Sequence, residues 1–335
     1  MAGLSAVVVR FMITAGVLDR PDARKAHKRP IPKGGGVGVV AAFLVGTAIL
    51  YGVAGFARIA DPYFLGVILA ASAIAAVAFL DDLRDWPFTV KLAAQLVAAG
   101  IAVASGLVVA SVNLPAWGKL PLGLFGVAAT MAWILFTTNA MNFIDGLNGL
   151  AAGVGVIACI ALAVIAATMG GWFVYFTSLL LAAGLLGFLP FNFPRARIFM
   201  GDVGSQFCGF VLAVLGVVAA RFEQVELSAL LVPLLLFGVL FDVAFTLVRR
   251  LLAGDRLTQA HRSHLYQVAH RAGMSATTVT LVHWGFALWG ALCCAVFLHA
   301  VGLGKPLALL LALPPQLLWI GIVFWLARRA RIGRW

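Results

Sequence analysis

Apolar runs of about 20 residues recur from one end of this 335-residue chain to the other. A run of that length, wound as an α-helix, spans the roughly 30 Å hydrocarbon core of a bilayer. Because a bilayer offers its backbone groups no water, such a run is predicted to be a membrane helix. Hydrophobic residues make up 63% of the chain and charged residues only 11%, which excludes a soluble globular domain and a disordered chain.

We therefore predict an all-α polytopic integral membrane protein, forming a single transmembrane domain over residues 1–335. The first run is short and is interrupted by Arg10, so the count is about eleven transmembrane helices, or ten if that run is too short to span. The runs cover approximately residues 2–18, 35–56, 62–80, 88–109, 122–142, 147–168, 171–189, 202–220, 227–248, 276–300 and 305–327.

The positive charges indicate how these helices are oriented. Alternating the runs places 19 of the 24 lysines and arginines on one side of the membrane. Positive charge marks the cytoplasmic side, so this side and the C-terminus are predicted to be cytoplasmic. Topology thus explains the net charge of +12 better than nucleic-acid binding does. The four cysteines fall inside apolar runs without metal-type spacing, and they imply neither disulfides nor zinc.

The acidic residues gather on the same predicted side. Neutralisation of nearby positive charge is the preferred explanation for three of them: Asp19, Asp22 and Asp255. The basic stretch from Asp19 to Lys33 is expected to follow the anionic membrane surface. The glycines that come after it resemble a nucleotide-binding fingerprint only superficially, because a membrane helix follows and no strand precedes them.

The stretch 139–150 joins two apolar runs and carries a polar residue at every third position: Asn139, Asn142, Asp145 and Asn148. Residues three apart share a helix face, so these side chains are expected to point in related directions. Polar groups at a membrane border are costly unless they are paired or bound. A polar helix connection is one interpretation, but the regular spacing favours a binding site.

Two further motifs carry carboxylates. Asp81 and Asp82 end an apolar run, where the negative end of the helix dipole disfavours them, so capping does not explain the pair. A divalent metal or phosphate chemistry is the better interpretation, whereas solvation suffices for Asp85. Asp202 precedes another run and, taken alone, fits an N-cap. Arg195 just upstream supplies a cation suited to phosphate oxygens.

A histidine motif lies between the last runs, from His261 through Arg262 and His264 to Tyr266 and Gln267. The spacing of the two histidines would also suit zinc, but a third ligand at matching spacing is missing. Their charge near neutral pH is suited to binding a diphosphate. A merely solvated loop is the alternative interpretation.

Together these loops resemble the polyprenyl-phosphate N-acetylhexosamine-1-phosphate transferases, a glycosyltransferase family that includes the phospho-N-acetylmuramoyl-pentapeptide translocase. The resemblance covers nearly the whole chain, in the order Asp19–Gly36, Asp81–Asp85, Asn139–Leu150, Gly201–Ser205, Asp242–Arg250 and His261–Gln267. Initiators of this family usually carry a His-x-His-His run in the last loop. Here His264 takes the first position, and Tyr266 and Gln267 replace the other two histidines. The motif looks more like the branch that starts pseudomonad-type O-antigens, with a 6-deoxy-N-acetylhexosamine donor.

The resemblance implies a reaction between UDP-N-acetylhexosamine (UDP-GlcNAc, or a 6-deoxy sugar such as FucNAc or QuiNAc) and undecaprenyl phosphate, releasing UMP. It implies Mg²⁺, with Mn²⁺ as substitute, and a bacterial inner-membrane protein whose catalytic loops face the cytoplasm. A homodimer is left open. The roles it implies are catalytic for Asp81, Asp82 and His264, metal-binding for Asn142 and Asp202, and substrate-binding for Asn139, Asp145, Arg195, His261 and Arg262.

A transporter of an anionic substrate is the alternative class. The polar residues of a transporter would line a route through the helices. Here the acidic residues crowd the loops on one side, and Asp242 is the exception that lies well within an apolar run. Inverted repeats, a common feature of transporters, are also not seen in the sequence.

Overall fold

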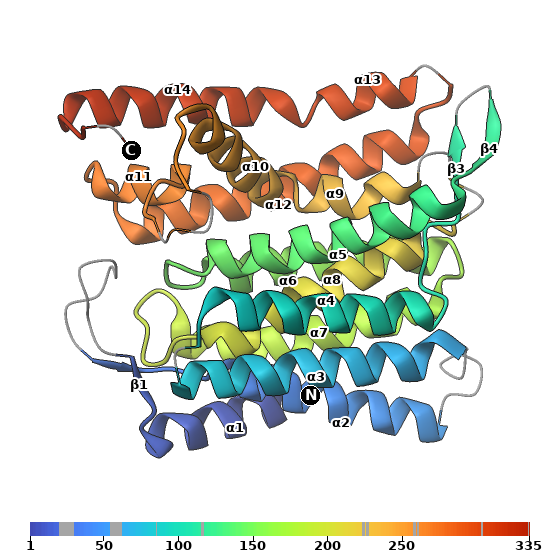
Figure 1. The fold of residues 1–335 in the computed structure, drawn as a ribbon, viewed down its shortest axis with the longest axis horizontal. Coiled ribbons are helices and arrows are strands. Elements are labelled where there is room, and N and C mark those ends of the chain that lie inside the picture. The colour runs from blue at the N-terminus through green and yellow to red at the C-terminus, as the bar shows by residue number, and fades with distance from the viewer. Residues whose placement is uncertain are drawn as a thin grey trace.

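The computed structural model describes the chain except residues 20–29, 54–61, 85, 115–116, 223–224, 226–227, 257–258, 260, 303 and 334. The predictions for Asp22, Asp85 and most of the basic stretch therefore lie outside the described residues. The long helices run side by side along one direction, and two short strand pairs lie at opposite ends of the bundle (Figure 1).

The helices are α1 Ala2–Ala15, α2 Gly36–Val53, α3 Pro62–Arg84, α4 Phe88–Ala104, α5 Gly123–Ile144, α6 Leu150–Thr168, α7 Trp172–Asn192, α8 Gly201–Ala219, the 3₁₀ turn η2 Ser228–Leu230, α9 Leu231–Leu235, α10 Phe237–Leu252, α11 Leu265–Arg271, α12 Ala276–His299, α13 Gly304–Leu310 and α14 Leu313–Arg329. The antiparallel strand pairs are β1 Leu18–Asp19 with β2 Ile31–Pro32, and β3 Ser111–Leu114 with β4 Gly118–Pro121.

This architecture confirms the all-α polytopic class, but it does not confirm eleven spans. Eight helices of the described chain are long and apolar enough to cross a membrane, or nine if the bent pair from Ser228 to Leu252 is one span. Two predicted spans, α1 and α4, are shorter apolar helices. The 14 residues of α1 rise only about 21 Å, and the helix ends at Gly16, whose φ of 73° is left-handed.

The central helix of the bundle is α8, which packs against α2, α3, α5, α6 and α7. Every residue from Val203 to Ala219 is buried, as expected for a helix that is apolar on all sides. Such a helix is fixed by its neighbours along its whole length. Its first turn, which carries Asp202, is therefore held in the middle of one end of the bundle.

The start of α2 approaches the start of α8 so closely that their backbones touch. The N–H groups of Gly35 and Gly36 donate to the carbonyls of Phe199 and Met200, at 2.9 and 2.8 Å. A Cβ added at Gly36 would overlap the Cα of Gly204. This contact, rather than nucleotide binding, accounts for a glycine at position 36.

We expect Gly36→Ala to destabilise the protein by roughly 1–3 kcal/mol, because backbone cannot move aside as a flexible side chain can. Thermal unfolding in detergent micelles would measure this loss. The matched control is Gly100→Ala in α4, where an added Cβ would have no described atom within 4 Å. Equal unfolding temperatures for the two variants would contradict the close approach.

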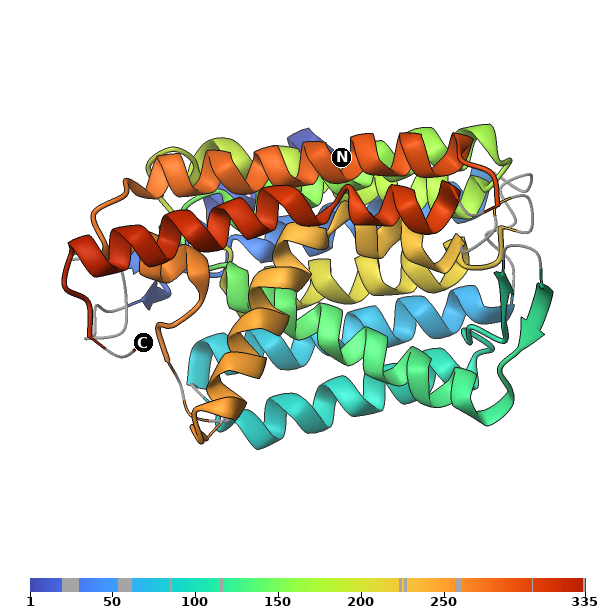
Figure 2. The same ribbon diagram turned by 90° about the horizontal axis from the view of Figure 1, so that it is seen from above.

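The ninth predicted span is broken rather than continuous. Its two parts, Ser228–Leu235 and Phe237–Leu252, meet at an angle of 80°. In Figure 2, α10 accordingly crosses the direction of the other helices. One face of α10 is buried and carries Asp242, Thr246 and Arg250 at intervals of four residues. The break turns this polar face toward α11 and the end of the bundle that carries Asp202.

Candidate active site

A pocket of about 680 Å³ opens at the end of the bundle that carries β1, β2 and α11. It brings together seven of the ten residues that the sequence predicted for the site: Asp81, Asp82, Asn142, Asp145, Arg195, Asp202 and Arg262. The remaining lining residues are Asp19, Ile31, Lys33, Lys91, Gly146, Leu147, Asn148, Asn192, Ala196, Phe199, Gly201, Tyr266, Gln267, His270 and Ala276. The pocket is therefore strongly charged, with carboxylates and cations from segments far apart in the sequence.

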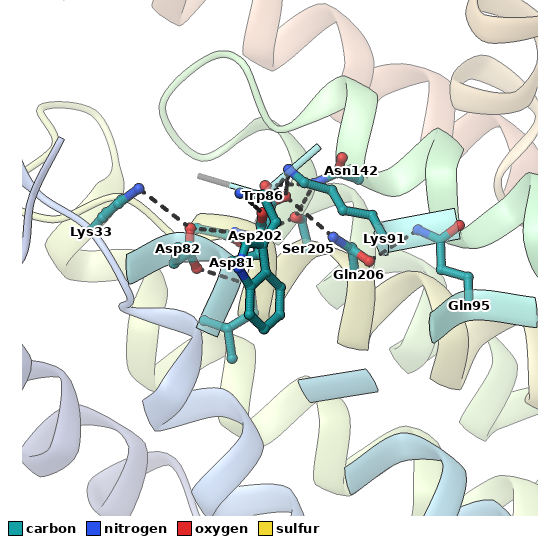
Figure 3. A network of polar contacts seen from close by, with 12 residues as sticks. Lys33, Asp81, Asp82, Trp86, Lys91, Gln95, Asn142, Asp202, Ser205 and Gln206 are labelled. Carbon is teal, nitrogen blue, oxygen red and sulfur yellow. Dashed lines mark hydrogen bonds and ion pairs between the residues drawn. The ribbon is translucent and has the colours of Figure 1, made fainter. Parts of the chain in front are cut away.

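The centre of the pocket is an ion cluster on three helices (Figure 3). The ammonium of Lys91, in the first turn of α4, lies 2.6 Å from Asp81 Oδ2 and 2.8 Å from Asp202 Oδ2. Two carboxylates this close would repel each other without a cation between them. Lys91 thus offsets their charge at a place where the neighbouring helices exclude much of the water.

Asp82 caps the central helix from outside. Its carboxylate accepts hydrogen bonds from the backbone N–H groups of Asp202 and Val203, at 3.2 and 3.1 Å. Lys33 approaches the same carboxylate at 3.9 Å. A negative group on the first free N–H groups of a helix is favourable. The N-cap interpretation of Asp202 is therefore wrong, because Asp82 supplies this cap and leaves the Asp202 carboxylate for other partners.

Asn142 is one of those partners. Its side-chain amide donates to Asp202 Oδ1 at 3.0 Å and to Ser205 Oγ at 2.9 Å. Asn142 lies near the end of α5, and Asp202 lies at the start of α8, a helix that packs against α5. The two residues assigned to a metal from the sequence are thus direct neighbours.

Asp145 follows the last residue of α5 and lines the same pocket. Burial, reinforced by the nearby carboxylates of Asp202 and Asp82, raises the pKa of Asp145 well above its usual value. A carboxyl group in such surroundings is stabilised when a cation or a proton joins it. The pocket therefore favours cations in addition to Lys91.

Asn139 is not among the described lining residues of the pocket, and its predicted role in substrate binding stays a prediction. Its side-chain N–H₂ donates to Gln95 Oε1 at 2.6 Å and to the carbonyl of Leu135 at 2.8 Å. Residues three apart on a helix differ by about 60° in direction, so Asn139 and Asn142 do not point the same way. The buried side chain of Gln95 on α4 hydrogen-bonds with the amide of Asn139. Asn142, one turn further along, is the amide that faces the pocket.

His264 is also not among the lining residues. It is 3% exposed and stands at the N-cap of α11, with its Nδ1 3.3 Å from Asp242 Oδ1. Asp242 accepts in addition from the backbone N–H groups of Leu265 and Tyr266, at 2.9 and 3.0 Å. The buried carboxylate of α10 thus holds one ring nitrogen of His264, whose catalytic role stays a prediction.

His261 lies outside the described lining of the pocket, and its predicted role in substrate binding stays a prediction. It is half-buried outside the pocket, and Ser263 Oγ lies 2.8 Å from its Nδ1. Burial, with the nearby His264 and Arg250, lowers the pKa of His261 to about 4. A lowered pKa favours the neutral form of the ring at neutral pH. Arg262, next to His261 in the sequence, does line the pocket.

Tyr266, which replaces a histidine of the usual motif, connects α11 to the end of α5. Its hydroxyl donates to the carbonyl of Phe143 at 2.7 Å. A Cβ added at Gly146 would overlap this hydroxyl, so the tyrosine lies directly against the turn after α5. The side chains of Tyr266 and Gln267 thereby form one wall of the pocket.

Comparison with known proteins identifies a family for this arrangement. The family model described as glycosyl transferase family 4 matches residues 64–220. A probable undecaprenyl-phosphate N-acetylglucosaminyl 1-phosphate transferase of Bacillus subtilis is 32% identical over 281 residues, which cover 83% of this chain and 76% of that protein. The chain belongs to glycosyl transferase family 4.

Other relatives of this family 4 protein show similar coverage. A decaprenyl-phosphate N-acetylglucosaminephosphotransferase of Mycobacterium tuberculosis is 30% identical over 329 residues, covering 87% of this chain and 81% of that protein. An undecaprenyl-phosphate alpha-N-acetylglucosaminyl 1-phosphate transferase of Thermotoga maritima is 30% identical over 285 residues, which cover 83% of this chain and 82% of that protein. The resemblance drawn from the motifs is thus confirmed.

The pocket of this family 4 protein fits Mg²⁺ by the chemistry of its donors. Mg²⁺ binds oxygen ligands, usually one or two carboxylates together with substrate phosphates and water. Asp202 can supply a carboxylate oxygen and Asn142 an amide oxygen, and the two side chains are in contact through the Asn142 N–H₂, which donates to Asp202 Oδ1. Among the described residues, no group of three His, Cys, Asp or Glu side chains could hold a metal ion. The donor set therefore suits a metal shared with a phosphate ligand and not a closed structural site.

Several residues of the site were not predicted as site residues. Lys91 lies just inside an apolar run and belongs to no motif, and Lys33 ends the basic stretch. A lysine inside an otherwise apolar helix was an available signal for Lys91, since such residues are usually paired and functional. Gln95 and Gln206 carried no motif, although a buried glutamine in a membrane helix also needs a partner.

Proposed function

We propose that this protein transfers an N-acetylhexosamine 1-phosphate from a UDP-sugar to a polyprenyl phosphate, with undecaprenyl phosphate as acceptor and UMP as leaving group. The observation that carries the proposal is the ion cluster of Lys91, Asp81 and Asp202 in a charged pocket at one end of an apolar helix bundle. The names of the Bacillus and Thermotoga relatives, which specify undecaprenyl phosphate, support the acceptor.

The reaction joins two anions, so the pocket must lower their mutual repulsion. Four cationic side chains line it: Lys33, Lys91, Arg195 and Arg262. Charge-assisted hydrogen bonds from such groups are the strong contacts that proteins make with phosphates. Mg²⁺ bound through Asp202 and Asn142 would add the divalent charge that polarises phosphate oxygens.

In the proposed step, an oxygen of the lipid phosphate forms a bond to the sugar-bearing phosphorus of the donor. The bond between that phosphorus and the bridging oxygen breaks, and the electron pair leaves with UMP. A phosphate monoester is largely ionised at neutral pH, so it needs little help from a base. Positioning and charge stabilisation supply the catalysis in such reactions. Here Lys91 orients Asp81 and Asp202, and Asp82 fixes the start of α8 beneath them.

For the donor we propose UDP-GlcNAc or a UDP-linked 6-deoxy-N-acetylhexosamine, and for the product a role in starting O-antigen or a related envelope glycan. The relatives' names favour N-acetylglucosamine, whereas Tyr266 and Gln267 in the last motif favour the 6-deoxy sugars. Purified protein would be incubated with undecaprenyl phosphate and each UDP-sugar, and the lipid product weighed by mass spectrometry. A product heavier by one sugar phosphate supports the proposal, and no product with any donor contradicts it.

We also propose that the pocket faces the cytoplasm in a bacterial inner membrane. The basic residues Arg328, Arg329 and Arg331 end the chain near the pocket end of the bundle, whereas β3 and β4 lie at the other end (Figure 1). Lysines and arginines concentrate on the cytoplasmic side of membrane proteins.

Single-cysteine labelling in intact cells would test this orientation, on a background without the four native, buried cysteines. An impermeant maleimide is expected to label Lys119→Cys in β4 and to leave Arg331→Cys unlabelled until the cells are opened. Both positions are exposed, so access to water is matched. The reverse pattern would place the pocket outside and remove its access to cytoplasmic UDP-sugars.

A further inference from the structure

Beneath the pocket, three carboxamides from three helices form a connected chain. They are Gln95 of α4, Asn139 of α5 and Gln206 of α8, and both glutamines are almost fully buried, at 2% and 3% exposure. Gln95 bonds Asn139 through both its amide atoms, and its Nε2 donates to Gln206 Oε1 at 3.0 Å. Gln206 Nε2 then donates to Asp202 Oδ2 at 3.2 Å, as Figure 3 shows.

The order of these bonds fixes the direction of every amide. The carbonyl of Leu135 can only accept, so it must face the N–H₂ of Asn139. That N–H₂ also meets Gln95 Oε1, which turns Gln95 Nε2 toward Gln206 Oε1. Gln206 is left with its donor facing Asp202. The chain thus presents an N–H, and never a carbonyl oxygen, to the carboxylate.

The N–H from Gln206 meets the same oxygen of Asp202 that accepts from Lys91, while Asn142 donates to the other oxygen. The lysine side chain is partly exposed, whereas Gln206 is buried among α8 and its neighbours. Buried, aligned hydrogen bonds of this kind polarise one another and hold a single geometry. Gln206 therefore helps to fix the rotation of the carboxylate from outside the described lining of the pocket, whereas Lys91 and Asn142 do so from within it.

We propose that Gln206, itself oriented by Gln95, is a positioning residue that holds the Asp202 carboxylate for the transfer reaction. The inference rests on the proposed function and adds to it a relay of carboxamides outside the pocket. A purely structural bridge between α4, α5 and α8 would stabilise the fold without affecting turnover once the protein is folded. The two roles differ in what happens to kcat and to cation binding at the site.

The test uses Gln206→Met, Gln95→Met and the double variant in the full-length protein. Methionine has a similar length and no hydrogen-bond donor, so it removes the contact with little change in volume. We expect Gln206→Met to lower kcat at least tenfold with KM values within threefold, and to weaken Mn²⁺ binding, followed by electron paramagnetic resonance, several-fold. The matched control is Gln316→Met, a buried glutamine of α14, which contributes no residue to the described lining of the pocket.

The double variant separates a relay from independent packing. If Gln95 acts through Gln206, Gln95→Met lowers kcat several-fold in the wild-type background and less than twofold when Gln206 is already replaced. Equal losses in both backgrounds overturn the relay, and a folded Gln206→Met enzyme with kcat within twofold of wild type overturns the inference. Gln206→Asn, too short to reach Asp202, takes its place if the methionine variant does not fold.

Failure of the proposed function gives a different result. In that case the wild-type protein itself releases no UMP with any donor. The Mn²⁺ measurement then decides the inference alone: weaker binding in Gln206→Met than in Gln316→Met supports it, and equal binding overturns it.

Discussion

Replacing Asp202 by asparagine is expected to lower turnover by roughly 10³-fold, the upper end of what removal of one preorganised electrostatic contact causes in enzymes. The change keeps the shape of the side chain but removes the negative charge that Lys91, Asn142 and Gln206 surround. Because Asp82 caps α8, the helix start does not depend on the Asp202 side chain. The unfolding temperature in detergent should stay within a few degrees of wild type.

The control for this variant is Asp255→Asn. Asp255 has a side chain 43% exposed, lies 3.7 Å from Arg250, and is absent from the described lining of the pocket. Its replacement should leave kcat nearly unchanged. Near-normal turnover in Asp202→Asn would remove this carboxylate from the reaction and, with it, the proposed metal position.

Replacing Lys91 by methionine is expected to cost both activity and stability. The carboxylates of Asp81 and Asp202 would then face each other without the ammonium that lies within 2.8 Å of both. Removing one partner of a buried pair costs roughly 3–5 kcal/mol, and the partial exposure of Lys91 places the expected loss at or below the lower end of that range. We expect kcat to fall roughly 10²-fold or more, because the orientation of Asp202 is lost as well.

A second change separates these two effects. Asp81→Asn added to Lys91→Met removes one of the repelling charges, so it should restore part of the lost stability without restoring turnover. Unfolding temperature and kcat would be measured on the same preparations, with Lys119→Met at the far end of the bundle as a control for loss of a lysine. A Lys91→Met enzyme with wild-type turnover would contradict the central place of the ion cluster.

The helices could be predicted from the sequence because apolar runs and their charged ends reflect the bilayer directly. The predicted runs 122–142 and 202–220 differ by only one or two residues from α5, Gly123–Ile144, and α8, Gly201–Ala219. The broken span from Ser228 to Leu252 was missed. Its sequence carries two helix-breaking residues, Pro233 and Gly238, on either side of the 80° bend, and this signal was available in the sequence.

The site could be predicted only as a set of loops on one side. Topology gathers Asp81, Asn142 and Asp202 at one end of the bundle, so their motifs were informative. The contacts between individual side chains could not be predicted. Lys91 and Asp202, for example, are 111 residues apart, and no periodicity relates them. The partner of the histidine motif was equally hidden in the sequence, since Asp242, which lies 3.3 Å from the His264 ring, is 22 residues earlier in the chain.

The central claim is that UMP, and not UDP, leaves the donor. The proposed reaction breaks one phosphoanhydride and makes another, so its free energy should lie within a few kcal/mol of zero. Each 1.4 kcal/mol changes the equilibrium constant about tenfold, so both directions are measurable. A glycosyltransferase that placed the sugar directly on the lipid phosphate would release UDP instead.

Isotope exchange tests this claim most directly. Purified protein would be given undecaprenyl-diphospho-sugar, Mg²⁺ and radiolabelled UMP, and the UDP-sugar fraction would be isolated and counted. We expect label to enter UDP-sugar at a rate that depends on the lipid and on Mg²⁺, and to be lost in Asp202→Asn. UDP as the forward product, with no label passing from UMP into UDP-sugar, would contradict the proposed transfer of sugar 1-phosphate.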